Sequence, residues 1–242
     1  YSTQWDSLCH VGGWFDADGD GKPEVVYYNG WRGDEHIISP KEKIEADEFT
    51  KFEGSNAKAL GIENMAEACV QGRGVLIDLE KRHGRKRVLV GYEELMEILE
   101  EDKIKIEEGD MACFHTGFAQ GLIDMNKNPN EHDLHNTFAC LNGRDEKLHN
   151  WIRDVGISVI IADNYGIEDV GTPLPKGSEP IAMLPLHELC IFKLGIHIGE
   201  MFYLTPLRNW LRDNNRSRFL LTAPPLRLPG AVGSPPSPIA TV

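Results

Sequence analysis

The stretch Ile157-Ser158-Val159-Ile160-Ile161-Ala162-Asp163 is a near-continuous apolar run that ends in a carboxylate. Strands of this composition are typically buried on both faces of a sheet. Two earlier stretches, Val75–Leu79 and Asp110–Gly117, have a similar apolar character, and the second ends in a glycine turn. The run therefore predicts a central strand, with Asp163 at its carboxyl end.

Helical patterns alternate with these strands. Tyr92–Glu101 places Leu95, Ile98 and Leu99 on one face, and Glu146–Val155 follows as another helix. Such alternation predicts an α/β fold with a parallel or mixed sheet and with functional groups at the strand ends.

The remaining segments complete this outline. A mostly polar, helical region is expected from 40 to 71, ending in an amphipathic stretch at 62–70 that Gly72 and Gly74 break. The other expected elements are a strand at Val25–Tyr28, a polar loop at Asn126–His135, a helix at Leu184–Leu194 stopped by Gly195, a strand at Ile196–Leu204 and a last strand at Phe219–Ala223. The tail 224–242 holds six of the 14 prolines, so either disorder or an ordered extended segment is compatible with it.

Composition excludes several classes of function. The 242 residues carry a net charge of −13, which disfavours binding to a phosphate backbone. No apolar run approaches the roughly 20 residues that cross a bilayer. The five cysteines form no C-x-x-C pair, which indicates reduced, mostly buried thiols and a cytoplasmic protein.

The opening stretch Ser2–His10 gathers an amide, a carboxylate and an imidazole at Gln4, Asp6 and His10. If Gln4–Asp6 is extended, the first two side chains leave the same face of a strand. If a helix opens at Asp6 instead, His10 lies above the carboxylate one turn later. Either arrangement can build a metal or acid–base site.

A second candidate cluster lies near the other end of the chain. Glu200 stands among apolar residues, and a buried carboxylate needs a cation or a strong donor. His187 precedes it by 13 residues, so a helix and a tight turn could bring both to one site. The alternatives are a structural His187 and a pairing of Glu200 with Arg208 or Arg212.

The segment Phe15–Glu24 contains a D-x-D-x-D-G pattern, with Asp16, Asp18 and Asp20 alternating before a glycine. Calcium loops of the EF-hand type begin in this way. However, the bidentate glutamate expected at position 12 is replaced by Tyr27, and no second copy of the pattern occurs. A solvated acidic turn is the alternative to a calcium-dependent interaction site.

Taken together, these segments resemble the cyclase or kynurenine-formamidase-like metal hydrolases. That family carries H-x-G-T-H-x-D-x-P-x-H near its N-terminus, and Ser2–His10 resembles the later part of this motif. Four further segments resemble later family motifs in the same order: His115-Thr116-Gly117, Ala162–Glu168, His187–Glu200 and the closing stretch 223–235 of the larger members.

The resemblance implies a swivelling β/β/α fold around a mixed sheet, formed by one cyclase-like domain over 1–242 with the N-terminal part of the family domain missing. It also implies a homodimer or homotetramer, and a divalent metal, Mn²⁺ or Zn²⁺, that serves to hydrolyse a C–N bond in a small cyclic or formylated amide. Carried over by position, Asp6, His187 and Glu200 would be metal ligands and His10 the general acid/base. Asp163 and His115 could lie at the rim of the site.

This sequence departs from the family motif in two places. Gln4 replaces the second histidine, and the first histidine would fall before Tyr1. We therefore expect one ion held by Asp6, His187 and Glu200, with Gln4 as a further oxygen ligand, and this oxygen-rich set favours Mn²⁺ over Zn²⁺. The alternative is a catalytically altered relative that binds a small molecule in the same cleft.

Overall fold

The computed structural model describes residues 2–39, 56–170 and 182–242. Its strands are β1 (Gln4–Asp6), β2 (Gly13–Phe15), β3 (Glu24–Val26), β4 (Ile37–Ile38), β5 (Asn56–Ala57), β6 (Gln71–Asp78), β7 (Val88–Val90), β8 (Met111–His115), β9 (Ala139–Leu141), β10 (Val159–Ala162), β11 (His197–Glu200), β12 (Arg218–Thr222), β13 (Gly233–Ser234) and β14 (Ile239–Thr241). Its helices are η1 (Tyr28–Gly30), α1 (Ile62–Ala68), α2 (Leu79–His83), α3 (Tyr92–Glu101), α4 (Phe118–Asp124), α5 (Glu131–Asn136), α6 (Glu146–Val155), α7 (Pro185–His187), the π-helix η3 (Glu188–Leu194) and α8 (Thr205–Asp213).

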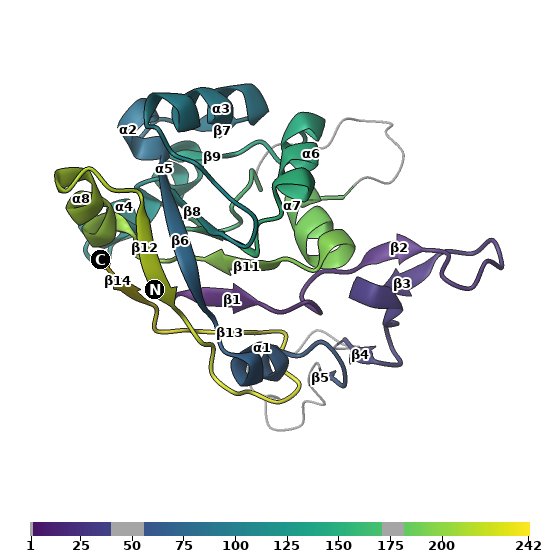
Figure 1. Cartoon of the computed structure of the whole chain (residues 1–242). Helices are drawn as coiled ribbons and strands as arrows, with labels where there is room; N and C mark the ends of the chain where they lie inside the picture. Colours follow the sequence, from purple (N-terminus) through teal and green to yellow (C-terminus); the bar gives the residue numbers. More distant parts are fainter. Residues whose placement is uncertain (1, 40–55, 171–181) are drawn as a thin grey trace.

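The architecture is an eight-stranded mixed sheet with the order β13-β1-β11-β10-β8-β6-β12-β14 (Figure 1). The four central strands β11, β10, β8 and β6 are parallel, whereas β1, β12, β13 and β14 pair antiparallel at the two sides. This arrangement confirms the predicted α/β fold around a mixed sheet.

The central strand β10 is buried on both faces of the sheet. Ile160 of β10 packs with one apolar cluster that includes residues of α2, α3, α6 and η3. Its neighbour Ile161 packs with the opposite cluster, which includes residues of α1 and α8. Because successive side chains of a strand point to opposite faces, a strand between two helical layers needs apolar residues at every position. This requirement explains the unbroken apolar run from which the strand was predicted.

Several predicted elements match the structure closely. The helices expected at Tyr92–Glu101 and Glu146–Val155 have the predicted ends. Gly195 ends the helical region after Leu194 with a φ of 69°, a left-handed conformation that glycine adopts without strain. Of the helical region expected from 40 to 71, residues 40–55 lie outside the described residues.

Other elements differ from the predictions for local physical reasons. Gly72 and Gly74 lie inside β6 rather than breaking a helix. A Cβ on Gly74 would approach the ring of Phe219 on β12 to 2.4 Å, so glycine makes room there for an aromatic side chain. The expected loop at Asn126–His135 contains the start of α5, which the Asn130 side chain caps by accepting from the amide of Asp133.

Three strand predictions need correction. The strand expected at Val25–Tyr28 ends at Val26, and the chain then enters η1. The strand expected at Ile196–Leu204 is shortened to β11. Phe219–Ala223 is not the last strand, because the proline-rich tail is extended and contributes β13 and β14. These two strands pair with β1 and β12, at the two sides of the sheet.

The central position of β10 gives a stability prediction. Ile160→Ala should lower the free energy of unfolding by about 2–5 kcal/mol, because it removes fully buried methyl and methylene groups from the contact with the helical layer. Urea denaturation followed by circular dichroism measures the change.

Leu220→Ala is the matched control, because this leucine of β12 is 43% exposed in the same sheet. Its loss should be about 0.5 kcal/mol. Equal losses at the two positions would contradict a core centred on β10.

Candidate metal centre

The pairing of β1 with β11 creates the site. In this antiparallel register Gln4 lies opposite Glu200, and Asp6 lies opposite Ile198. Because side chains alternate along a strand, Asp6 and Glu200 point to the same face of the sheet. The alternative in which a helix opens at Asp6 is therefore excluded.

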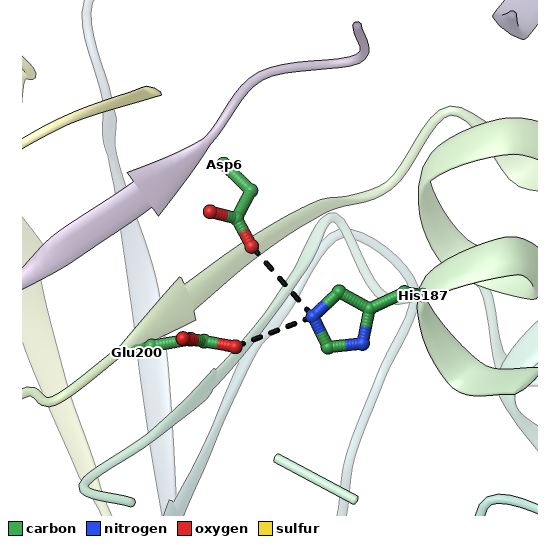
Figure 2. A group of neighbouring side chains, drawn as sticks. All are labelled: Asp6, His187 and Glu200. Carbon is green, nitrogen blue, oxygen red and sulfur yellow. Dashed lines mark hydrogen bonds and ion pairs between the residues drawn. The ribbon is translucent and has the colours of Figure 1, made fainter. Parts of the chain in front are cut away.

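His187 reaches the two carboxylates from the helical layer (Figure 2). Its Nε2 lies 3.2 Å from Oε1 of Glu200 and 3.8 Å from Oδ2 of Asp6. Ligand atoms of the three residues lie within 4.8 Å of one another, a separation from which one cation could contact all of them. The structure thus brings together the two sequence clusters.

Glu168 fixes the position of His187. This buried carboxylate accepts from Nδ1 of His187 at 2.9 Å, and also from the backbone amides of Leu186 and His187. A carboxylate behind a histidine sets the tautomer of the ring and leaves Nε2 directed at the site. Sequence reasoning placed Glu168 in a family-like segment but gave it no role, since only the fold shows that it faces His187.

The site brings carboxylates close together without enough positive charge to balance them. Burial raises the pKa of Asp6, and the nearby Glu200 raises it further, against the lowering effects of His10 and Gln4. Oδ2 of Asp6 is buried and has no hydrogen-bond partner among the described residues. A buried carboxylate oxygen without a partner is costly, and a cation would satisfy it. The residues present therefore fit a divalent metal ion.

His10 and Gln4 flank Asp6. Nε2 of His10 lies 3.8 Å from Oδ1 of Asp6, and the side chain is about one-third exposed, with a relative accessibility of 33%. Nε2 of Gln4 donates to the same Oδ1 at 2.6 Å. His10 is placed where it could exchange protons with bound water, while Gln4 as a metal ligand stays a prediction.

The arginine pairing considered for Glu200 is wrong. Oε1 of Glu200 accepts from the amide of Gly166 at 2.9 Å and faces His187. Arg208 instead donates to Glu80 at 2.5 Å, and Arg212 lies beside Asp213. Both arginines lie on α8, and their printed partners are carboxylates other than Glu200.

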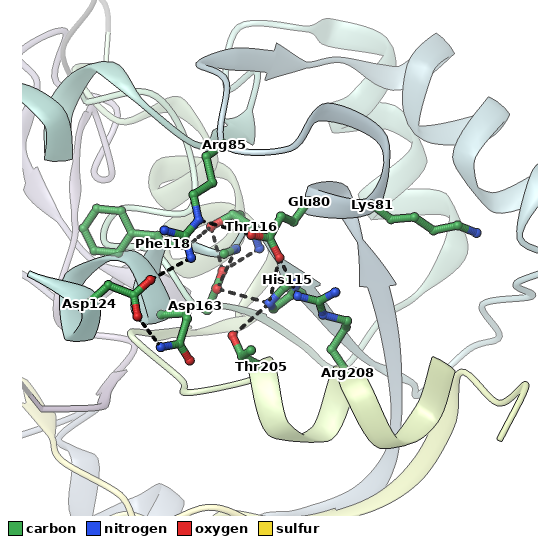
Figure 3. Close-up of polar contacts among 12 residues, drawn as sticks. Glu80, Lys81, Arg85, His115, Thr116, Phe118, Asp124, Asp163, Thr205 and Arg208 are labelled. Carbon is green, nitrogen blue, oxygen red and sulfur yellow. Dashed lines mark hydrogen bonds and ion pairs between the residues drawn. The ribbon is translucent and has the colours of Figure 1, made fainter. Parts of the chain in front are cut away.

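His115 and Asp163 lie in a separate buried network rather than at an exposed rim (Figure 3). Nδ1 of His115 faces Asp78 at 2.9 Å. Its Nε2 faces Thr205 at 3.1 Å. Asp163 accepts from the amide and hydroxyl of Thr116 and from the amide of Gly117. These contacts hold together the carboxyl ends of β6, β8 and β10.

The acidic loop is exposed. Asp16, Asp18 and Glu24 approach one another, but Oδ1 of Asp16 already accepts from the amides of Gly19 and Asp20. Such side-chain-to-backbone bonds are ordinary in acidic turns. A calcium function for Asp16, Asp18 and Asp20 stays a prediction.

The cysteines agree with the sequence prediction of mostly buried thiols. Cys9, Cys113, Cys140 and Cys190 are buried, and only Cys69 among the five is exposed. None of the helices in the described ranges is long and apolar enough to span a membrane.

Fold and site together define a mixed α/β protein with a buried carboxylate–histidine centre at the carboxyl edge of its sheet. The model of the Cyclase family, described as "Putative cyclase", matches residues 1–169. The chain therefore belongs to the Cyclase family, which confirms the resemblance found in its motifs.

Solved structures agree with this assignment. The crystal structure of a novel cyclase has a TM-score of 0.73 and 29% identity, over 99% of this chain and 68% of that chain. Isatin hydrolase A from Labrenzia aggregata, bound to benzyl benzoate, has a TM-score of 0.57 and 14% identity over 99% of this chain and 72% of its own. Isatin hydrolase A from Ralstonia solanacearum has a TM-score of 0.57 and 15% identity, with coverages of 98% and 70%. At these low identities the two isatin hydrolases show a shared fold. No curated protein sequence matches the chain.

The contact between Glu168 and His187 can be tested in metal-free protein. Burial lowers the pKa of His187, but hydrogen bonds to Glu168 and Glu200 outweigh it and raise the pKa from 6.5 to about 9. The stabilisation from this charge should be fully present below pH 6.5 and should be lost as the pH rises through about 9. Glu168→Gln should move the pKa of His187 down, as measured by NMR titration of the ring with a chelator present.

Glu131→Gln, an exposed carboxylate of α5, is the control and should leave the His187 titration unchanged. A His187 pKa that stays near 9 in Glu168→Gln would show that Glu168 does not hold the ring.

Proposed function

We propose that the chain is a metal-dependent hydrolase that cleaves a C–N bond in a small cyclic or formylated amide. The observation that carries the proposal is the buried group Asp6, His187 and Glu200, with an unpartnered carboxylate oxygen, beside the partly exposed imidazole of His10. The shared fold with isatin hydrolases, whose named substrate is a cyclic amide, supports the class of bond.

In this proposal Asp6, His187 and Glu200 would hold the ion, and Glu168 keeps Nε2 of His187 directed at the two carboxylates. The chemistry that a divalent metal would supply there is polarisation of the substrate carbonyl and a lower pKa for water. Two carboxylates and one imidazole form an oxygen-rich set, which favours Mn²⁺ over Zn²⁺.

His10 would perform the proton transfers. Its Nε2 takes a proton from the attacking water as the new C–O bond forms, and then gives that proton to the leaving nitrogen as the C–N bond breaks. The side chain suits this role because it adjoins Asp6 and also reaches solvent. We further propose a cytoplasmic homodimer or homotetramer that acts on a small molecule.

A second candidate is a catalytically altered relative that binds a small molecule without turnover. The observation that favours it is Gln4, which stands where the family motif has a histidine and whose amide nitrogen faces Asp6. Metal analysis of protein purified without chelator separates the two candidates. A stoichiometric ion with amide turnover supports the hydrolase, whereas metal-free protein that still binds lactams supports the binding relative.

Substitution of ligands and of the base should separate their roles. Asp6→Asn and Glu200→Gln should lose both bound metal and turnover, because each removes a charged donor of the ion. His10→Asn should keep the metal but lose about 100-fold or more in turnover, since it removes only proton transfer. Elemental analysis and assays on isatin and small formamides measure the two properties.

Glu131→Gln, on α5, removes an exposed carboxylate that belongs to none of the candidate metal-binding groups and should change neither property. Full metal occupancy in both Asp6→Asn and Glu200→Gln would rule out the assigned site.

Gln4→His restores the residue type of the family motif. We expect it to increase the metal retained during dialysis, because an imidazole is a stronger ligand than an amide for Mn²⁺ or Zn²⁺. Dialysis against graded chelator, followed by elemental analysis, measures retention. Unchanged metal retention in Gln4→His would mean that the side chain at position 4 does not reach the ion. Gln4→Asn is the control for disturbance of β1 by substitution at this position.

A further inference from the structure

A cavity of about 420 Å³ lies between the start of α2, the segment after α3 and the C-terminal half of α8. Its volume is within the range of about 300–1,000 Å³ that is usual for small-molecule sites. Its walls come from elements other than β1, β11 and α7, which carry the metal centre. The proposed hydrolysis therefore gives this cavity no role.

The lining of the cavity is basic. The cationic side chains are those of Lys81, Lys103, Arg208, Arg212 and Arg216. The carboxylates in the wall are Asp78 and Asp102, which leaves an excess of positive charge in a chain of net charge −13. A cavity lined by positive charges attracts anionic ligands, even in a protein whose net charge is negative.

Arg208 forms the anchored part of this lining. Its side chain is only 14% exposed, and one guanidinium nitrogen donates to Glu80. Its Nε is buried, lies 3.8 Å from Oδ2 of Asp78 and makes no hydrogen bond among the described residues. Asp78 is itself engaged by His115 and by the amide of Lys81. The guanidinium is thus held in place at the cavity wall without using all of its donors.

Two other cations of the lining, Lys81 and Arg212, are more exposed than Arg208. Figure 3 shows Lys81 extending from α2 above and Arg208 rising from α8 below. Lys81 pairs with Asp102, and Arg212, whose side chain is 56% exposed, lies 3.6 Å from Asp213. Exposed ion pairs of this kind contribute little free energy, so both cations could exchange partners at small cost.

We propose that this cavity binds a small multivalent anion of the phosphate or polycarboxylate kind. Guanidinium groups match both chemistries, because their planar donors form paired hydrogen bonds with phosphate and carboxylate oxygens. The excess positive charge favours a ligand with more than one negative charge over a neutral amide. This site is independent of the metal centre and would exist even if the chain hydrolyses nothing.

Calorimetric titration of the whole chain at constant ionic strength tests the proposal. Pyrophosphate probes phosphate chemistry, citrate probes polycarboxylates, and chloride sets the ionic background. Lys103→Gln/Arg212→Gln should weaken binding of the preferred anion by about tenfold or more, because two charge-assisted contacts are lost. Arg216→Gln provides a second variant of the same wall.

Lys22→Gln/Arg227→Gln is the matched control, since it also removes two exposed cations, neither of which lines the cavity. It should change the affinity by less than about twofold, as expected for screened surface charges. Saturable binding of either anion that only the cavity variants weaken supports the proposal. No saturable heat at millimolar concentration for either probe, or equal weakening by the control pair, overturns it.

Discussion

The antiparallel pairing of β1 with β11 is the interaction on which the rest of the candidate site depends. It joins two strands from opposite ends of the chain, and Nδ1 of His197 reinforces it by donating to the carbonyl of Asp6, 191 residues earlier in the sequence. Without this pairing Asp6 would not be held beside Glu200, which would keep only its contacts with His187 and the amide of Gly166. The pairing converts two weak sequence clusters into one group of potential ligands.

The electrostatics of that group point towards a cation. Three carboxylates, Asp6, Glu168 and Glu200, surround one imidazole, so protonation of His187 can neutralise only part of their charge. The negative charge that remains is least compensated at Oδ2 of Asp6, which is buried and has no hydrogen-bond partner among the described residues. Stability without metal and affinity for metal are therefore set by the same charges, as is common where metal binding and proton release are coupled.

The sequence predicted the central features of the fold because they depend on local periodicity. The apolar run at 157–162 and the two long helices could be recognised without knowledge of their neighbours. The need for glycine at position 74 could not be recognised in this way, because it arises from the Phe219 ring on another strand. The ordered tail was equally beyond local reasoning, since its hydrogen bonds are made to β1 and β12.

The candidate site follows the same rule. Residue type and order were enough to select Asp6, His187 and Glu200, whereas Glu168 was missed because a carboxylate that supports a histidine has no fixed spacing from it. The pairing of Glu200 with an arginine was reasonable from charge alone. It failed because Arg208 pairs with Glu80, a carboxylate at the start of α2.

The tail has a practical consequence for anyone handling this protein. Through β13, residues close to the C-terminus hold the free side of the strand that carries Asp6, and Ser7 bonds to Val232 in the same region. A protease cut or a poorly chosen tag junction near 230 would thus remove the support on one side of β1, the strand that carries Asp6, and leave it paired with β11 alone. Because β1 and β13 pair with each other, loss of order in one of these strands should be detectable in the other.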